Sequence, residues 1–318
     1  MELIRHPEIT PLEISDVRVD GATLWEWSQN RGFASALRRA LNAWHAGAGA
    51  TEVDESTASV LFGIDAVFLT GGRVEDEALR GELRGVSASV AFGEEPLFSG
   101  ARGGFDLLQT HGLSGWVADL GKSQLKLAAP GRRWTFQRDW TRLRMSGEVS
   151  LAEVPAQRRR LREFIALRLQ MAMAESGERP RALVAALPVK MDDDGSPHRS
   201  NYAGMKADRR LLPDAMEQAG LAGLPLFVLN DAALAALSAL SDPRLAGFRK
   251  VLVLTLGFGI GAALIHRDNG TMCLQPSKIP KIKIAPQAGF ASLPVPLAGS
   301  RCSGSPSQGK RPQVAAFV

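Results

Sequence analysis

The sequence has few of the residues that would mark a disulfide-rich, zinc-binding or membrane-spanning protein. Cys273 and Cys302 are its two cysteines, and neither has a metal-type partner at short spacing, so we expect no disulfide framework and no zinc cluster. The longest apolar run, residues 251–265, is too short to span a bilayer, and residues 1–10 carry charges where a signal peptide needs an apolar stretch. We therefore expect a cytoplasmic protein without a membrane partner.

The sequence also has only a small excess of charge of one sign. The 38 Lys and Arg residues exceed the 33 Asp and Glu residues by a formal +5, which does not indicate a nucleic-acid partner. The most basic segment, residues 158–162, has arginines interleaved with apolar residues at helical spacing, which is typical of a solvated helix face. With 318 residues, 45% of them hydrophobic, the chain is a globular protein long enough for two domains.

Apolar runs that end in turn residues alternate with amphipathic segments along the chain. Hairpins are predicted at residues 116–128 and 251–265, because apolar positions continue on both sides of a glycine turn. We predict strands or extended segments at residues 65–70, 86–91, 133–136, 143–146, 182–188, 224–229 and 278–284, and helices at 23–45, 75–83, 153–175, 207–219 and 232–240. This order predicts an α/β fold with mixed sheets that helices cover on both faces.

The first hairpin carries Asp119, Gly121, Lys122 and Ser123 at its turn. Such a turn can wrap a phosphate with backbone N–H groups, and the carboxylate can hold Mg²⁺ through water. Any β-turn also favours Asp, Gly and Ser, so an ordinary turn is the alternative. Lys122 either reaches a phosphate oxygen or is solvated.

The second hairpin has glycines at alternate positions, Gly257, Gly259 and Gly261, after Thr255. Glycine weakens a strand, so this pattern indicates that a ligand approaches the backbone closely. A phosphate is the ligand that we expect there. A bulged and tightly packed strand pair is the alternative.

Asn230 and Asp231 stand where a predicted strand passes directly into a helix. Either residue can serve there as a helix N-cap. The carboxyl ends of strands in α/β sheets also present ligand groups, so Asp231 is a candidate general base toward a hydroxyl.

The segments at residues 117–128, 182–195, 200–205, 224–237 and 253–265 resemble, in order and approximate spacing, the motifs of the ROK sugar kinases. That family belongs to the actin, hexokinase and heat-shock ATPase superfamily. The resemblance implies that both hairpins bind the phosphates of ATP, that Asp119 binds Mg²⁺ through water, and that Asp231 is the catalytic base. It also implies that Asn201, Asn230 and Asp231 contact the acceptor.

The adenosine motif of that superfamily, a strand that ends in Gly-Gly, lies near the C-terminus in relatives. Here the best candidate ends at Gly71 and Gly72, before the first hairpin, and residues 97–108 resemble the helix that usually follows it. The resemblance therefore implies a circularly permuted, two-lobed actin-like (ribonuclease H-like) fold. Residues 1–110 and 246–290 would form the second lobe and residues 111–245 the first, while residues 291–318 would be an irregular or disordered tail.

These observations predict an ATP-dependent phosphotransferase that acts on a small hydroxyl-bearing substrate, for which a sugar is one candidate. The alternative is an actin-like nucleotide-dependent switch or assembly ATPase without a small acceptor. It is favoured because no Glu-x-Gly-His element, which contacts sugar hydroxyls in ROK kinases, follows the second hairpin. Self-association is left open.

Overall fold

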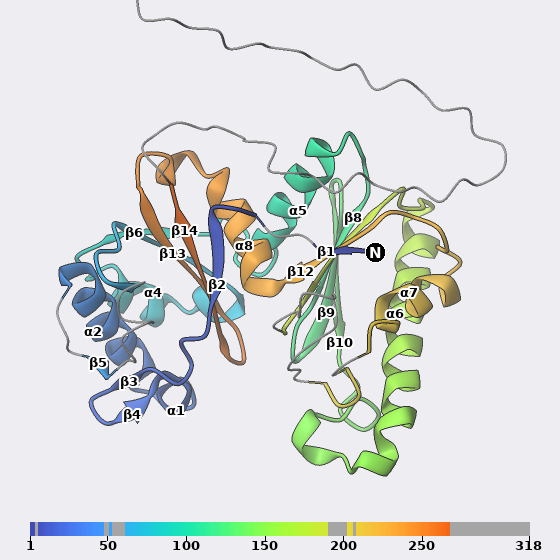
Figure 1. The fold of residues 1–318 in the computed structure, drawn as a ribbon, viewed down its shortest axis with the longest axis horizontal. Coiled ribbons are helices and arrows are strands. Elements are labelled where there is room, and N and C mark those ends of the chain that lie inside the picture. The colour runs from blue at the N-terminus through green and yellow to red at the C-terminus, as the bar shows by residue number, and fades with distance from the viewer. Residues whose placement is uncertain (4–5, 48–50, 53–60, 190–201, 206–207, 268–318) are drawn as a thin grey trace, which may run out of the picture. The chain divides into compact units, whose positions relative to one another are not determined.

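The protein is described here by a computed structural model, which covers residues 1–3, 6–47, 51–52, 61–189, 202–205 and 208–267. These residues form a mixed α/β fold of sheets flanked by helices (Figure 1). Asn201, the strand predicted at 278–284 and the tail predicted at 291–318 lie outside the described residues. None of the described helices is both long and apolar enough to cross a membrane.

The first sheet, sheet A, has six strands in the described part of the chain. In spatial order they are β1 (Glu2–Leu3), β12 (Leu226–Asn230), β11 (Leu183–Leu187), β8 (Trp116–Leu120), β9 (Gln124–Ala129) and β10 (Arg132–Gln137). The strands β1, β12, β11 and β8 run parallel, and β8, β9 and β10 form an antiparallel meander. The predicted hairpin at 116–128 is confirmed as β8 and β9.

The second sheet, sheet B, combines strands from distant parts of the sequence. In spatial order they are β2 (Ile9–Leu12), β14 (Ile260–His266), β13 (Lys250–Leu256), β6 (Ala66–Thr70) and β7 (Ser89–Phe92). The strands β2, β14 and β13 are antiparallel, whereas β13, β6 and β7 are parallel. The predicted hairpin at 251–265 is confirmed as β13 and β14.

The two sheets share one plan. Each has an antiparallel meander whose first strand lies beside two parallel strands, so β13, β14, β2, β6 and β7 correspond in turn to β8, β9, β10, β11 and β12. The helices α6 (Val154–Ser176), α7 (Leu211–Gln218) and α8 (Asp231–Leu240) follow the third, fourth and fifth strands of sheet A. The helices α2 (Phe33–Ala46), α4 (Glu77–Leu83) and α5 (Ser99–Thr110) follow the corresponding strands of sheet B.

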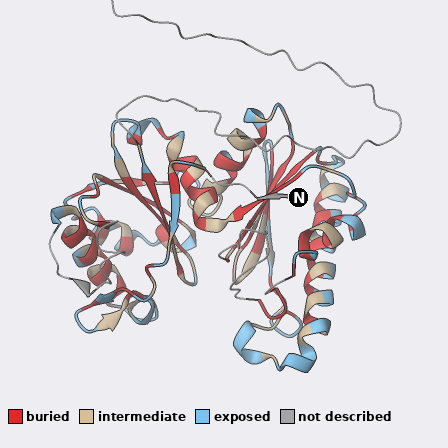
Figure 2. Cartoon of the chain, in the orientation of Figure 1, coloured by how far each residue is buried: buried red, intermediate tan, exposed pale blue. Residues whose placement is uncertain are grey.

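Alternate strand residues face different helices, as the period of two in a strand requires. On one face of sheet A, Trp116 and Ala118 pack with α6 and α7, and on the other Val117 packs with α5. Sheet B packs against α2 and α4 on one face and against α8 on the other. The strands therefore lie at the centre of the buried core (Figure 2).

The helices α5 and α8 pack against each other, and each also covers the sheet that does not precede it. Glycines make this approach close: a Cβ on Gly103 would lie 2.5 Å from the backbone nitrogen of Ser238, and one on Gly104 would lie 2.6 Å from Val117. The N–H of Gly103 also donates to Ser238 Oγ at 2.7 Å. Glycine is thus required here by packing.

A small third sheet, β4-β3-β5, lies next to α1 (Leu24–Ser28) and α2 in the sequence. Its strands are β3 (Arg18–Val19), β4 (Ala22–Thr23) and β5 (Thr51–Glu52). The segment predicted as a helix at 23–45 forms two helices, and Gly32, the residue before α2, lies between them. The segment predicted as extended at 143–146 forms no strand, but Met145 is extended and makes an isolated bridge with Tyr202.

Candidate functional site

The carboxyl edge of sheet A brings together two carboxylates. Asp119 lies near the end of β8, and Asp231 is the first residue of α8, directly after β12. Ala186 of β11 is in register with both Asp119 and Leu229, so Asp231 is two residues farther along the same edge. Neighbouring parallel strands place their ends together, and this fixes both side chains at one site.

Asp119 forms an ion pair with Lys126, which faces it across the hairpin. Lys126 Nζ lies 2.5 Å from Asp119 Oδ2, and the two side chains are 14% and 26% exposed. The other carboxylate oxygen, Oδ1, is buried and has no hydrogen-bond partner among the described residues. Asp119 therefore keeps one acceptor atom for a ligand.

Asp231 is a half-buried carboxyl whose charge is disfavoured. Burial and, to a smaller extent, the negative charge of Asp119 raise its pKa to about 7, although the N–H of Ala232 and the charge of Lys126 oppose the shift. Ala232 N–H donates to Asp231 Oδ1 at 2.8 Å. Asp231 thus exchanges a proton near neutral pH, as a general acid or base must.

Asn230 has a structural task at the start of α8. Its Oδ1 accepts from the N–H of Ala232 at 2.9 Å and more weakly from that of Ala233 at 3.4 Å, which is the N-cap role that the sequence allowed. Its Nδ2 donates to the carbonyl of Val189 at 2.9 Å. Asn230 therefore fixes the helix start that carries Asp231.

The turn of the first hairpin is held from several sides. Gly121 N–H donates to Gln124 O at 2.9 Å, and Tyr202 donates its hydroxyl hydrogen to Gly121 O. Ser123 O accepts from the N–H of Arg138 at 2.8 Å. A turn fixed through its carbonyls is preorganised to present the remaining N–H groups.

In the second hairpin the glycines differ in what surrounds them. A Cβ on Gly257 would meet no heavy atom within 4 Å, so the space above it is open. A Cβ on Gly261 would lie 2.3 Å from Thr255 Oγ1, so this glycine is explained by the tight packing of the strand pair. On Gly259 it would lie 3.2 Å from the ring of Trp25. Packing therefore accounts for Gly261, whereas none of the described residues crowds Gly257.

The tips of the two hairpins meet through Lys122 and Phe258. Lys122 Nζ lies 3.1 Å from the centroid of the Phe258 ring and 5.5 Å from that of Trp25, which are cation–π contacts. Burial lowers the pKa of Lys122, and the charge of Arg138 adds to this effect. Lys122 is therefore not simply solvated, and its contact with a phosphate oxygen stays a prediction.

Gly71 lies against the second hairpin. Its φ of +97° is one that L side chains rarely adopt, and a Cβ there would lie 2.5 Å from the carbonyl oxygen of Leu256. Because Leu256 precedes Gly257, the predicted adenosine motif at Gly71 and Gly72 and the second hairpin are neighbours in sheet B.

Three residues at this edge escaped the sequence-based prediction: Lys126, Tyr202 and Arg138. Lys126 could have been found by counting the hairpin register outward from the turn, since that register places it opposite Asp119. Arg138 is 2% exposed, with its guanidinium 3.3 Å from the ring centroid of Trp140. No local pattern marks Arg138 or Tyr202, because both reach the turn through tertiary contacts.

The residues fit a magnesium ion through a single ligand. Mg²⁺ in phosphotransfer sites is usually bound by one or two carboxylates together with substrate phosphates and water. Asp119 Oδ1 could serve as such a ligand, and no cluster of three or more His, Cys, Asp or Glu side chains suited to a metal occurs among the described residues.

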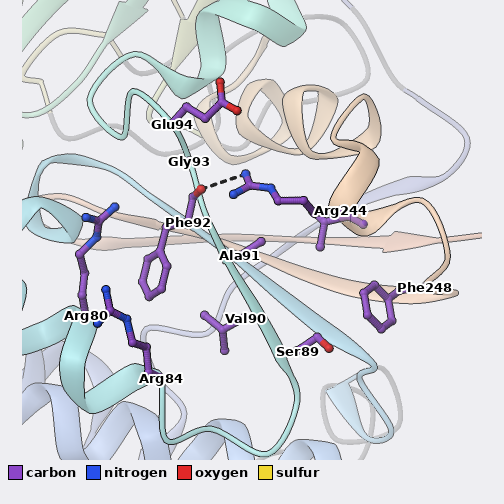
Figure 3. A pocket seen from close by; sticks show the side chains of 11 residues that line it. Arg80, Arg84, Ser89, Val90, Ala91, Phe92, Gly93, Glu94, Arg244 and Phe248 are labelled. Carbon is purple, nitrogen blue, oxygen red and sulfur yellow. Dashed lines mark hydrogen bonds between the residues drawn. The ribbon is translucent and has the colours of Figure 1, made fainter.

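A cavity of about 460 Å³ lies beside β7, and none of the residues predicted to bind nucleotide lines it. Arg80 and Arg84 line it on one side of the strand and Arg244 and Phe248 on the other (Figure 3). The cavity that Asp119 and Lys126 help to line has a volume of about 10 Å³.

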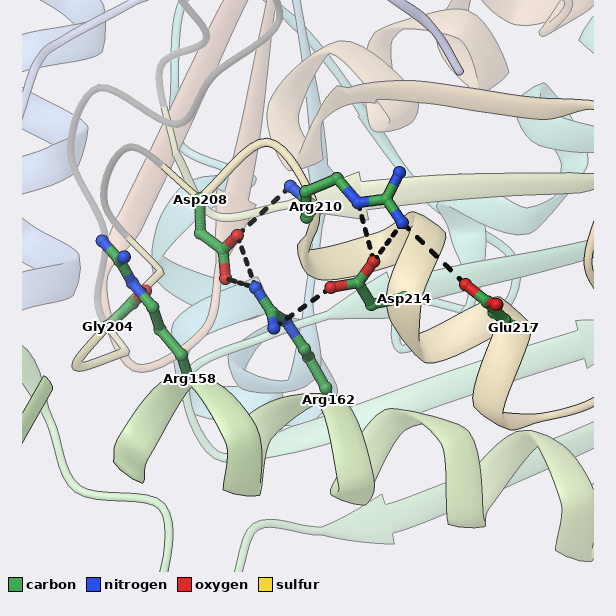
Figure 4. A network of polar contacts seen from close by, with 7 residues as sticks. All are labelled: Arg158, Arg162, Gly204, Asp208, Arg210, Asp214 and Glu217. Carbon is green, nitrogen blue, oxygen red and sulfur yellow. Dashed lines mark hydrogen bonds and ion pairs between the residues drawn. The ribbon is translucent and has the colours of Figure 1, made fainter. Parts of the chain in front are cut away.

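We expected the basic segment at 158–162 to be a solvated helix face, but two of its arginines are bound to other parts of the chain. Arg162 lies 2.8 Å from Asp208 and 3.1 Å from Asp214, and the Asp208 side chain is 5% exposed. Arg158 donates from Nε to Gly204 O at 2.9 Å (Figure 4). These arginines join α6 to the segment that leads into α7, whereas Arg159 is 72% exposed.

No protein-family model matches the sequence, and no curated protein matches it. Among solved structures, the chain is similar to a ROK hexokinase from Thermus thermophilus, at 21% identity and a TM-score of 0.31. The similarity covers 48% of this chain and 46% of that one, so the chain spans about half of the hexokinase it matches. A likeness of this size assigns neither a family nor an activity.

Proposed function

We propose that the protein is an ATP-dependent phosphotransferase that acts on a hydroxyl of a small acceptor, with a sugar as one candidate. The observation that carries the proposal is the position of Asp231, a carboxyl with a pKa of about 7, on the same strand edge as Asp119. A base with a pKa near the working pH is what general-base catalysis favours.

The two hairpins would hold the phosphates. Gly121 to Ser123 and Gly257 to Gly259 form turns whose tips lie together, because Lys122 contacts Phe258. Backbone N–H groups in such turns bind anions, and Asp119 Oδ1 would hold a hydrated Mg²⁺. Bound Mg²⁺ would neutralise charge on the transferred phosphoryl group. Lys122 would leave the Phe258 ring to reach a phosphate oxygen.

The chemical step would need one proton acceptor, which is Asp231 in its ionised form. The acceptor hydroxyl gives its proton to Asp231 while its oxygen forms a bond to the terminal phosphorus. The bond from that phosphorus to the bridging oxygen breaks, and its electron pair leaves with the diphosphate. Asn230 would act as a positioning residue, because its side chain fixes the start of α8, and the second hydrogen of its Nδ2 would donate to the acceptor.

We further propose that sheets A and B are the two lobes of a circularly permuted actin-like fold. The shared strand plan supports this, because the third, fourth and fifth strands of sheet B precede its first and second strands in the sequence. Gly71 and Gly72 would contact adenosine, which their position beside Leu256 supports. Asn201 would contact the acceptor, as the resemblance to ROK kinases implies.

A switch or assembly ATPase without a small acceptor is the second candidate. It is favoured because no Glu-x-Gly-His element, which contacts sugar hydroxyls in ROK kinases, follows the second hairpin in the sequence.

Acceptor-dependent turnover separates the two candidates. We would incubate the protein with ATP, Mg²⁺ and a panel of sugars and other polyols, and measure ADP release together with the mass of each product. The proposal expects one acceptor to raise ADP release and to gain a phosphoryl group. Asp231→Asn should bind nucleotide but transfer nothing, whereas Asp119→Asn should lose Mg²⁺-dependent binding. ADP release that no acceptor raises, and that Asp231→Asn leaves unchanged, would contradict the phosphotransferase.

A further inference from the structure

The parallel side of sheet A ends in a strand that covers the fifth strand of the plan, whereas the corresponding strand of sheet B is the edge of its sheet. In sheet A, β1 pairs in parallel with the fifth strand of the plan, β12, through Glu2 opposite Phe227 and Leu3 opposite Val228. The strand β7 takes the corresponding place in sheet B, and no described strand pairs with its outer side. An edge of this kind is a template for another strand.

The backbone of β7 offers hydrogen-bonding groups on that outer side. Ser89 N–H donates to Asp65 O at 3.2 Å and Gly93 N–H to Leu69 O at 2.9 Å, so these residues face β6. In a parallel ladder the intervening residues, Val90 and Phe92, direct their N–H and C=O groups the opposite way. The carbonyl of Phe92 accepts from Arg244 Nη2 at 3.0 Å, which confirms that direction.

The groove at this edge carries positive charge. Its cavity of about 460 Å³ is lined by Arg80, Arg84 and Arg244 against a single acid, Glu94 (Figure 3). Arg80 stacks 5.0 Å from the ring centroid of Phe92, so its charge is held beside the strand. Glu77 and Asp242 pair with Arg80 and Arg244, while Arg84 is exposed. Because two of the three arginines are already paired, an approaching chain would meet the strand edge together with the charge of Arg84, which is unpaired among the described residues.

We propose that β7 binds an extended acidic peptide segment of a partner protein as an added parallel strand. Strand addition derives its affinity from main-chain hydrogen bonds and its specificity from side chains on alternate sides. Carboxylates on one side of the added strand reach Arg80 and Arg84, and those on the other side reach Arg244. This binding does not depend on the proposed phosphotransfer.

The arginines near β7 disfavour two other occupants of this edge, the chain's own C-terminal segment and a second copy of β7. Residues 268–318 contain one acid, Asp268, and six basic residues: Lys278, Lys281, Lys283, Arg301, Lys310 and Arg311. Arginines on β7 repel such a segment. Pairing of β7 with a second copy of itself would likewise place arginines opposite arginines. An acidic partner segment satisfies both the backbone and the charge.

The test uses the full chain and a fluorescein-labelled peptide, the Glu-Val peptide, in which pairs of Glu alternate with pairs of Val so that both faces of an added strand carry carboxylates. Binding is followed by fluorescence anisotropy without nucleotide. A Lys-Val peptide and a Glu-Val peptide with alternate N-methylated amides are the controls. We expect saturable binding of the Glu-Val peptide only, weakened by salt. Equal binding of all three peptides, or no binding of the Glu-Val peptide up to about 1 mM, a typical limit for weak complexes, would overturn the proposal.

Variants of the protein separate the backbone from the charge. Val90→Pro removes an outward N–H without touching the pairing to β6, and we expect about fivefold weaker binding, whereas Val90→Thr keeps that N–H and should bind normally. Arg84→Glu should weaken binding about tenfold, and Arg159→Glu, at a 72% exposed site on α6, should not. Loss with Arg84→Glu but with neither Val90→Pro nor N-methylation would leave only charge attraction and overturn strand addition.

Two further measurements test whether a second copy of the chain or its own C-terminal segment occupies the β7 edge. Light scattering should give the same mass for the wild type and Val90→Pro at every concentration. A concentration-dependent dimer that Val90→Pro abolishes would assign the edge to a second copy of the chain. A synthetic peptide of residues 278–300 that binds more tightly than the Glu-Val peptide would assign it to the chain's own C-terminal segment. Either result would contradict an acidic partner.

Discussion

Sheets A and B repeat the same strand plan, but different pairs of side chains face each other near the ends of their first strands. Asp119 of β8 faces Lys126 of β9, while at the same place in sheet B Thr255 of β13 faces Gly261 of β14. One sheet thus has a half-buried ion pair where the other has a hydroxyl and a glycine. The comparison teaches that the shared plan positions hairpins, and that the side chains at one register position decide what each hairpin can do.

The helix layers differ in the same way. In sheet A, Arg162 of α6 is bound to Asp208, whose side chain is 5% exposed, before α7 begins (Figure 4). In sheet B, Arg38 of α2 reaches Glu82 of α4 at 3.2 Å, with side chains that are 39% and 33% exposed. The sheet A contact therefore carries a larger desolvation penalty and depends more on both partners being present.

Asp231→Asn should have the largest effect, because it removes the proposed base. We expect the rate of phosphoryl transfer to fall about 10²- to 10⁴-fold, and the wild-type kcat/KM to rise with pH through about 7 as Asp231 loses its proton. Steady-state ADP release with the acceptor measures both. Thr255→Val, on sheet B, should cost less than about tenfold if the hydroxyl makes one neutral hydrogen bond. Equal losses would remove the chemical contrast between the sheets.

Replacing Arg162 by Met should come next, and it tests the helix layers. Asp208 would be left buried without its partner, so we expect about 2 to 4 kcal/mol less stability, near the lower end for broken buried pairs because Arg162 is partly exposed. Arg38→Met should cost at most about 0.5 kcal/mol, as exposed pairs do. Urea unfolding followed by circular dichroism provides both values. If Arg38→Met proved the more damaging, the contrast would be reversed.

Gly103→Ala should destabilise the contact between α5 and α8. The new Cβ would lie 2.5 Å from the backbone nitrogen of Ser238, which cannot move freely, so we expect a loss of about 2 to 3 kcal/mol. Gly81→Ala in α4 meets no atom within 4 Å and should gain about 0.5 to 1 kcal/mol from helix propensity. Thermal unfolding of both variants gives the opposite signs directly, and two shifts of the same sign would contradict the packing argument.

The smallest predicted effect is a pH dependence of stability that originates in sheet A. The pKa of Asp231 rises from 3.8 to about 7 on folding, so between these values the folded state holds a proton that the unfolded chain releases. Stability from this group is therefore lost as the pH rises from about 4 to 7. Asp231→Asn should be more stable than the wild type at pH 8 by roughly 1 to 2 kcal/mol, a value reduced for partial exposure, and equally stable near pH 3. A pH-independent difference in urea unfolding would show that Asp231 titrates normally.

Elements with strong periodicity could be predicted from the sequence. The hairpins at 116–128 and 251–265 and the long helix at 153–175 were found because their apolar patterns are local. The strand β2 was missed, since Ile9–Leu12 contains a proline and pairs with β14 far along the chain. The segment at 143–146 has strand-like residues but no neighbouring strand to complete a ladder, so it stays a loop with one bridge.

The candidate site was predictable in part for the same reason. Strand ends are local features, so Asp119 could be predicted at a hairpin turn and Asp231 at the end of a strand, whereas the register that places both on one edge could not. What those carboxylates contact depends on tertiary packing, and neither the cation–π contact of Lys122 nor the hydrogen bond from Tyr202 to Gly121 has a sequence pattern. Gly261 was expected to face a ligand, but the packing of Thr255 explains it. The roles in nucleotide binding remain predictions.

The hairpin contact also gives the protein an optical reporter. Trp25 is 38% exposed, its ring centroid lies 6.0 Å from that of Phe258, and the charge of Lys122 lies 5.5 Å away. A positive charge so close to an indole alters the energy of its excited state. Movement of Lys122 away from Phe258 would therefore change the emission of this tryptophan. The difference in fluorescence between the wild type and Trp25→Phe thus follows the two hairpins without any label.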